Sequence, residues 1–317
     1  MREVSSPEQA ALALAHGHLA ILPTETVYGL GADADNREAV ARIFTTKNRP
    51  ANHPVIVHIS QQEHIYMWAT QIPDYAVDLG TAFWPGPMTL VLNRLPRAGD
   101  YLTGGQETIA LRVSSHPVFG EVLKELAHKT NDPSVGIAAP SANRFGSVSP
   151  TTLAHAVEEL GDHLTDEDVA LNGGSSRVGV ESTIIDATGS EPIILRHGGI
   201  TAEDIESVIK LSQSESDVRA PGTLASHYAP NKQLRLITHS ELLDTQPGAL
   251  IAMSDVETPF GFTRMATPKN VNEYAQLLYA AIRDADKSSE SVIYVVPPTG
   301  GGIAAAIRDR LNRAATK

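Results

Sequence analysis

Short apolar segments alternate with segments of helical periodicity through the first two hundred residues of this 317-residue chain. Each apolar run, such as Leu19 to Leu22, has the length of a buried strand and is far too short to cross a membrane. Further strands are predicted at 55–59, 88–92, 108–113, 135–139, 169–171, 182–186 and 193–195. Helical patterns cover 7–16, 36–46, 74–83, 117–128, 151–160 and 201–210. Because strands outnumber helices, we expect a mixed α/β domain with a sizeable sheet.

The pattern is interrupted between residues 211 and 230, where a serine-rich polar stretch leads into a segment without periodicity. Beyond it the alternation resumes, with strands predicted at 233–238, 248–253 and 291–296 and helices at 271–285 and 303–315. The sequence therefore predicts a large domain over 1–210, a linker over 211–230 and a small α/β domain over 231–317.

Composition excludes several classes of protein. The chain has no cysteine, which rules out disulfide scaffolds, thiolate metal sites and cysteine nucleophiles. A net charge of −12 argues against a broad basic surface that coats nucleic acid, although residues 151–217, with 3 basic and 14 acidic side chains, hold most of the excess. The N-terminal residues do not resemble a signal peptide, so we expect a cytoplasmic protein.

The segment from Pro23 to Gly31 follows the first long strand and contains two hydroxyls, a carboxylate, a phenol and two glycines. Polar groups at strand ends commonly carry function in α/β folds. A glycine-rich surface loop is one alternative. A dinucleotide fingerprint over 29–34 is another, but no helix opens at once and Asn48-Arg49 stands where the ribose-binding acid is expected.

Four cations lie at helix or strand ends. Pro50 forces Arg49 into an extended conformation, so Lys47 and Arg49 can point to the same side and suit a polyphosphate. The alternative is that helix C-termini favour cations in any case. Arg112, within an apolar strand, requires an anionic partner, and Arg196 ends another strand.

Isolated polar residues complete the candidate set. His58 interrupts an apolar strand and could be a structural histidine. Ser141 and Asn143 share one side of a strand end, and Ser149 could simply cap a helix. There is no Walker P-loop, no zinc-protease motif and no nucleophile elbow, and the glycines at 300–302 are better read as the lead-in to a helix.

Six ordered motifs resemble those of the YrdC/Sua5 family of threonylcarbamoyl-AMP synthases. They are Pro23-Thr-Glu-Thr-Val-Tyr-Gly-Leu30, Lys47-x-Arg49-Pro50, Pro54-Val-Ile-Val-His-Ile59, Ser141-Ala-Asn143, Glu181-Ser-Thr-Ile184 and Leu195-Arg-His-Gly198. Pro221-Gly222 and the His227-Tyr228-Ala229-Pro230 segment are similar to the longer Sua5 branch. The resemblance implies a mixed-sheet YrdC-like domain followed by a smaller Rossmann-like α/β domain.

The family forms L-threonylcarbamoyladenylate and pyrophosphate from L-threonine, bicarbonate and ATP, for the N6-threonylcarbamoyl modification of adenosine 37 in tRNA. The resemblance therefore implies a nucleotidyltransferase whose chemistry depends on positioning and charge neutralisation, without a strong nucleophile. It implies Mg²⁺ held mainly through the ATP phosphates and no protein metal site. It also implies proteins that transfer the product to tRNA as downstream partners, possible weak tRNA binding and no membrane partner.

The resemblance also implies residue roles. Lys47 and Arg49 are the expected catalytic residues. ATP contacts are expected from Lys47, Arg49, His53, Thr108, Ser141, Asn143, Ser149, Arg196 and His227. Threonine contacts are expected from Thr26, His58, Arg112, Ala139 and Ser182, with His227 and Tyr228 forming a lid. At position 53 the family often has Asn, and His53 can still donate a hydrogen bond there.

Two other functions are compatible with parts of this pattern. Related domains bind double-stranded RNA, so one alternative is an RNA-binding module without adenylate-forming activity. The other is a carbamoyl-adenylate synthase for a different amino acid. A pure RNA binder would not need a threonine pocket, and the retained motifs favour the enzyme.

Overall fold

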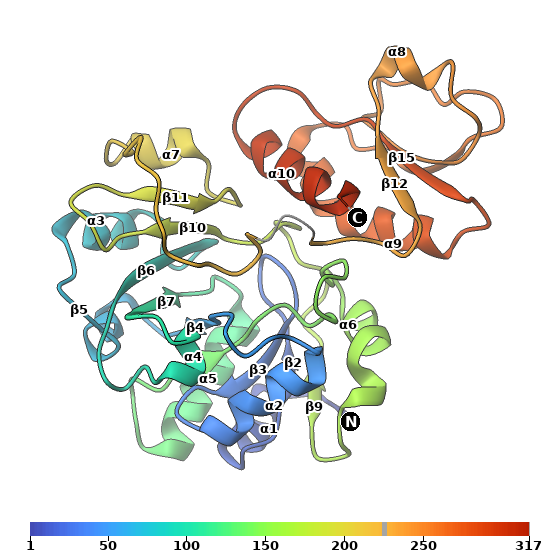
Figure 1. The fold of residues 1–317 in the computed structure, drawn as a ribbon. Helices are drawn as coiled ribbons and strands as arrows, with labels where there is room; N and C mark the ends of the chain where they lie inside the picture. The colour runs from blue at the N-terminus through green and yellow to red at the C-terminus, as the bar shows by residue number, and fades with distance from the viewer. Residues whose placement is uncertain (224–226, 317) are drawn as a thin grey trace.

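The computed structural model describes residues 1–223 and 227–316, which form two α/β domains with separate sheets (Figure 1). This confirms the predicted fold class. The boundaries at 210 and 230 stay a prediction, although the larger sheet ends before residue 211 and the smaller one begins after residue 230. None of the described helices is both long and apolar enough to span a bilayer.

The large sheet is mixed, and its strands run in the order β1-β9-β2-β3-β8-β4-β7-β6-β10-β11, with β5 paired to β6. Their bounds are β1 Arg2–Val4, β2 Ala20–Leu22, β3 Gly29–Asp33, β4 Ile56–His58, β5 Ala69–Thr70, β6 Met88–Arg94, β7 Thr108–Arg112, β8 Ile137–Ala138, β9 Val169–Leu171, β10 Thr183–Asp186 and β11 Ile193–Arg196. Strands β4 and β7 are parallel, and so are β6 and β10, whereas β2 with β3 and β6 with β7 are antiparallel. Segments far apart in the sequence thus lie side by side.

Helices cover both faces of this sheet. They are α1 Pro7–Ala15, α2 Arg37–Lys47, α3 Asp74–Phe83, α4 Asp100–Thr103, α5 Pro117–Thr130, α6 Leu153–Leu160 and α7 Ala202–Glu206, with 3₁₀ turns at Gln62–Met67 and Gly161–His163. Helix α1 begins as predicted, since Ser6 accepts from the Gln9 amide and Pro7 opens the helix. Helices α1 and α5 bury Leu14 and Phe119 on one face, and α2 and α3 pack into the larger core on the other.

The structure differs from the sequence reading at two places in this domain. Gly29–Asp33, for which a surface loop and a dinucleotide fingerprint were the alternatives considered, is buried strand β3, which was not predicted; a Cβ on Gly31 would lie 3.1 Å from Ile137. The last helix ends at Glu206 rather than near 210, and the Ser207 hydroxyl bonds back to the Asp204 carbonyl at 2.6 Å. Such local side-chain bonds compete with the helical ladder.

The C-terminal domain has four parallel strands in the order β12-β15-β13-β14, one more than the three predicted. Its elements are β12 Gln233–Leu236, α8 His239–Leu242, β13 Ala249–Ile251, β14 Thr263–Ala266, α9 Val271–Lys287, β15 Val292–Val295 and α10 Ile303–Ala315. Helices α9 and α10 lie on the side of this sheet that faces the large domain (Figure 1). The glycines before α10 are a helix lead-in, because Glu203 accepts from the Gly302 amide at 3.2 Å.

Candidate functional site

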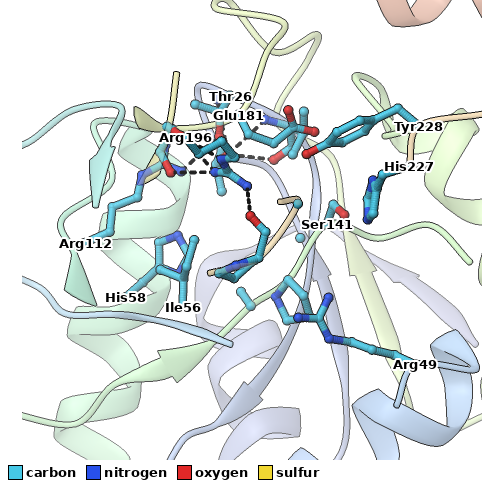
Figure 2. A pocket seen from close by; sticks show the side chains of 18 residues that line it. Thr26, Arg49, Ile56, His58, Arg112, Ser141, Glu181, Arg196, His227 and Tyr228 are labelled. Carbon is cyan, nitrogen blue, oxygen red and sulfur yellow. Dashed lines mark hydrogen bonds between the residues drawn. The ribbon is translucent and has the colours of Figure 1, made fainter. Parts of the chain in front are cut away.

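A cleft lies where strand ends of the large domain meet the linker (Figure 2). Its walls come from the loop after β2, the ends of β4 and β7, the turn after β8, the residues before β10 and the end of β11. The linker adds Pro221, Gly222, His227 and Tyr228. The mixed sheet thus gathers polar residues that are widely separated in sequence.

Ten of the residues singled out in the sequence line this cleft: Thr26, Arg49, His58, Arg112, Ala139, Ser141, Ser182, Arg196, His227 and Tyr228. Five others do not line it: Lys47, His53, Thr108, Asn143 and Ser149. The individual contacts explain this difference.

Lys47 and Arg49 flank the residue that ends α2. Asn48 adopts the left-handed conformation, with φ of 51°, and turns the chain so that Arg49 reaches the cleft. Lys47 instead lies fully buried beneath it, and its ammonium donates to the Ser141 and Asn143 carbonyl oxygens. Burial holds the pKa of Lys47 well below its ordinary value, and the neighbouring Arg49 adds to the effect. The lysine thus supports the turn that carries Ser141.

Arg49 and Arg196 enter the cleft without a carboxylate. The Arg49 guanidinium donates to the Pro54 carbonyl oxygen at 2.7 Å, and its Nε has no partner. Arg196 donates to the Ser182 and Pro221 carbonyl oxygens, both at 2.8 Å, and to the Ser182 hydroxyl at 3.1 Å. Burial lowers the pKa of Arg49 to about 10 and also lowers that of Arg196.

These contacts leave Lys47, Arg49 and Arg196 as three buried cations with no ion pair to any described carboxylate. Burial of an uncompensated charge is expensive, and main-chain carbonyls offset only part of that cost. An anionic ligand with several negative charges would supply the missing compensation. This charge imbalance is the chemical feature that most constrains what the cleft binds.

Arg112 lines the cleft on the side away from Arg49 (Figure 2) and is already neutralised. Its Nη2 lies 2.7 Å from Glu25 Oε1, and its Nη1 donates to the Thr26 hydroxyl at 3.0 Å. Burial alone would raise the pKa of Glu25, but Arg112 and Ser114 outweigh it and lower the pKa to about 2. The pair thus holds a positive and a negative charge side by side next to the cleft.

His58 stands next to this pair with both ring nitrogens unpartnered. Its ring packs against Phe119 with the centroids 4.9 Å apart. Burial lowers the pKa of His58 to about 3, and Arg112 adds to the effect, so the ring is neutral at pH 7. A satisfied structural histidine would have its ring nitrogens bonded, whereas this one leaves a donor and an acceptor for a ligand.

The residues outside the cleft wall have local roles in the structure. Asn143 donates to the Arg144 and Ser147 carbonyls and shapes its own turn. The Ser149 hydroxyl donates to Glu181 at 2.7 Å and does not cap α6, a role that Thr152 fills. Thr108 lies at the start of β7, four residues before Arg112, and its hydroxyl is buried without a partner.

His53 approaches the cleft through Phe145. The two rings are 5.3 Å apart, and Phe145 also contacts His227 at 5.9 Å and Arg49 at 5.8 Å. Burial, together with Arg49, lowers the pKa of His53. Phe145 was not among the predicted residues, and the sequence offers no signal for it beyond its position two residues after Asn143.

Sequence reasoning also missed two carboxylates at the site. Glu181 lines the cleft, and Glu25 pairs with Arg112 beside it; both lie in the ordered motifs, yet neither was predicted as a site residue. Glu181 is buried and accepts hydrogen bonds from Ser149, Tyr279 and Arg310. The signal for both was the need of buried arginines for acidic partners.

The predicted lid residues close one end of the cleft (Figure 2). Tyr228 is buried with φ of 62°, and its ring stacks on Tyr279 at 5.8 Å. A Cβ on Gly222 would lie 2.2 Å from the Tyr228 hydroxyl, so this glycine permits the approach. Leu224 to Ser226, which complete the segment between these residues, lie outside the described residues.

The chain matches two family models. The Sua5/YciO/YrdC model, described as "Telomere recombination", covers residues 12–198, and the model of the threonylcarbamoyl-AMP synthase C-terminal domain covers 200–316. Curated relatives named threonylcarbamoyl-AMP synthase include proteins of Pyrococcus abyssi and Bacillus subtilis. Each is 35% identical, over 96% and 97% of this chain respectively and 92% of the relative's length.

Solved structures of P. abyssi Sua5 have a similar fold. The complex with L-threonine aligns with a TM-score of 0.85 and 33% identity, covering 98% of this chain and 94% of the other. A variant with adjacent histidine and tyrosine replaced by alanine gives the same TM-score at 32% identity. Together with the two matched models, these similarities show that the chain belongs to the Sua5/YciO/YrdC family, in the branch that carries the Sua5 C-terminal domain.

Proposed function

We propose that this protein is a threonylcarbamoyl-AMP synthase, a nucleotidyltransferase that forms threonylcarbamoyl-AMP and pyrophosphate from L-threonine, bicarbonate and ATP for t6A37 modification of tRNA. The observation that carries the proposal is the set of three buried cations without carboxylate partners beside a neutralised arginine–glutamate pair. The three cations suit a triphosphate, and the arginine–glutamate pair suits a zwitterionic amino acid. The names of the relatives and the threonine complex of P. abyssi Sua5 support the same substrates.

Threonine binds on the Arg112 side in this proposal. Its carboxylate binds the guanidinium of Arg112, which lines the cleft, and its amine approaches the neighbouring Glu25 carboxylate. Thr26, Ala139, Ser182 and neutral His58 surround the side chain. A positive and a negative group held 2.7 Å apart match the two charges of an amino acid, which favours this end of the cleft for threonine.

ATP takes the side where Arg49, Arg196 and Ser141 line the wall. The threonine ammonium loses a proton, which dehydrates bicarbonate to CO₂ and water, and the neutral amine then captures CO₂ as a carbamate and releases one proton to solvent. A carbamate oxygen attacks the α-phosphorus, and the bond to pyrophosphate breaks as pyrophosphate leaves. Arg49 and Arg196 neutralise the developing charge, and Lys47 fixes the Ser141 turn from below. His227 and Tyr228 exclude water and retain the labile adenylate.

Magnesium enters with ATP in this scheme. Glu181, which lines the cleft, is held by Arg310, and Glu25 beside it is held by Arg112. These residues fit a Mg²⁺ ion carried by phosphate oxygens, which is the usual way nucleotide enzymes bind it. The ion would neutralise phosphate charge. A cytoplasmic location and transfer proteins that deliver the product to tRNA complete the proposal.

The test is pyrophosphate release by the purified protein. We expect release only when ATP, bicarbonate and threonine are all present, with serine in place of threonine giving much less. The double variant Lys47→Ala, Arg49→Ala should abolish release while the protein stays folded by circular dichroism. Release without threonine would reject the substrate assignment. Binding of double-stranded RNA without any turnover would favour the RNA-binding alternative.

A further inference from the structure

Glu181 connects the cleft of the large domain to the C-terminal domain. Its carboxylate lines the cleft, is buried, and accepts from Ser149 at 2.7 Å. The other two partners come from the C-terminal domain, where the Tyr279 hydroxyl of α9 lies 2.9 Å away and Arg310 Nε of α10 lies 2.7 Å away. A residue of the cleft wall is therefore held mainly by the second domain.

Arg310 is buried in the contact between the two domains and is not a surface residue. It is 1% exposed, donates to the His197 carbonyl at 2.8 Å, and lies 5.2 Å from the ring centre of Tyr228. Apolar residues of the large domain, such as Val148 and Val180, belong to the same buried cluster as α9 and α10. The two domains therefore make close, apolar contact at this point.

The charge balance of the cleft depends on this contact. Three arginines and one carboxylate, Glu181, line the cleft, and a second carboxylate beside it, Glu25, neutralises Arg112. Glu181 precedes Ser182, whose carbonyl and hydroxyl both accept from Arg196. Arg196 is, after Arg310, the cation that most lowers the pKa of Glu181, yet the ion pair that forms is with Arg310.

We propose that Arg310 is a positioning residue of the ATP site, which holds Glu181 and thereby keeps Arg196 free for the polyphosphate. The inference rests on the proposed function in that it takes ATP as the ligand. Without Arg310, the buried carboxylate would pair with Arg196, and the cleft would lose one positive charge toward the nucleotide. The C-terminal domain thus sets the electrostatics of a site to which it contributes no direct contact with ATP.

The test measures ATP binding separately from turnover. Arg310→Gln should raise the KM for ATP about tenfold, equivalent to roughly 1.4 kcal/mol, while the KM for threonine stays within about twofold. Calorimetry with ATP alone should show the same loss. Lowering the pH should partly restore ATP binding in this variant, because protonation of the unpaired Glu181 removes the competing charge.

The double variant Arg310→Gln, Glu181→Gln should return the KM for ATP toward the wild-type value, because both members of the pair are then neutral. Lys287→Gln is the matched control, since Lys287 makes an exposed ion pair with Glu158 across the same interface and does not reach the cleft. It should leave both KM values unchanged. If Arg310→Gln does not fold, Arg310→Lys, which keeps the charge, should show a near-normal KM for ATP, and Glu181→Gln alone should show no increase.

Equal changes in both KM values, or no rescue in the double variant, would overturn the inference and leave Arg310 with a purely structural role. An increase in the KM for ATP in Lys287→Gln would do the same, since domain docking alone would then account for the effect. Wild-type turnover is measured first. Its absence would reject the proposed function, and the ATP calorimetry would still decide the role of Arg310.

Discussion

At the scale of single residues, the cleft is organised by which charges are paired. Arg112 and Arg310 each hold a buried glutamate, whereas Lys47, Arg49 and Arg196 bond only to carbonyl oxygens and hydroxyls among the described residues. Buried charges that lack partners lower stability and are retained where a ligand needs them. We therefore expect the substitution of such a residue to impair function much more than stability.

Arg49→Met tests this expectation. It removes an uncompensated buried charge and one hydrogen bond, so the free energy of unfolding should change by no more than about 1 kcal/mol. ATP affinity, measured by calorimetry, should fall at least about tenfold. Arg42→Met is the control, because Arg42 pairs with fully buried Asp168 at 2.6 Å and lies outside the cleft. The control variant should have a lower unfolding temperature and an unchanged ATP affinity. A loss of ATP affinity in Arg42→Met, or a large loss of stability without a loss of affinity in Arg49→Met, would contradict this view of the cleft.

At the scale of elements, the domains meet through helix α9 and the loop before β10. Gly179 of this loop has φ of 79°, and a Cβ there would lie 2.3 Å from both the Ala275 carbonyl oxygen and Gln276 Cα of α9. The loop leads directly into Glu181 and Ser182. Helix α9 therefore determines how closely the C-terminal domain approaches the cleft.

Gly179→Ala should separate α9 from this loop. The clash with backbone atoms adds to the left-handed strain, so we expect a loss of about 3 kcal/mol or more in the free energy of unfolding. Gly174→Ala is the matched control, because Gly174 has a similar φ of 81° and no atom within 4 Å of its Cβ position. It should cost only about 1 to 2 kcal/mol. If thermal unfolding shows the same loss of stability for Gly179→Ala and Gly174→Ala, the contact with helix α9 does not contribute.

At the scale of the whole molecule, domain docking depends on a buried carboxylate. Burial alone would raise the pKa of Glu181, but Arg310, Arg196 and the hydrogen bonds outweigh it and lower the pKa from 4.5 to about 2. A carboxyl with a lowered pKa in the folded state contributes stability above its unfolded pKa and loses it on acidification. The interface should therefore weaken as the pH falls from about 4.5 toward 2.

Acid titration of the intact protein can measure this effect. We expect the free energy of unfolding to fall through that pH window, and Glu181→Gln to flatten the pH dependence while lowering stability at neutral pH. Glu25, with a pKa of about 2, titrates in the same window, so the difference between the wild-type protein and the variant isolates the Glu181 contribution. Identical pH profiles would show that Glu181 does not link docking to pH.

The sequence by itself determined the alternation of strands and helices, the two-domain architecture and most of the residues that line the cleft. The elements and domains follow from local signals, namely apolar periodicity and the N-cap before Pro7, and the cleft residues from polar side chains at strand ends together with the resemblance of the ordered motifs to a known family. The same local signals did not predict the strand at Gly29–Asp33, which forms through pairing with β2 and β8.

Only the tertiary structure decided how the charges of the cleft are paired. The sequence does not show that Glu25 neutralises Arg112, or that Arg49 and Arg196 have no carboxylate partner among the described residues. Nor does it connect Glu181 with Arg310, which is 129 positions away in another domain. Such pairs form because sheet topology and domain docking bring distant segments together in a dry interior, where the strength of an interaction depends on geometry and burial rather than on neighbours in sequence.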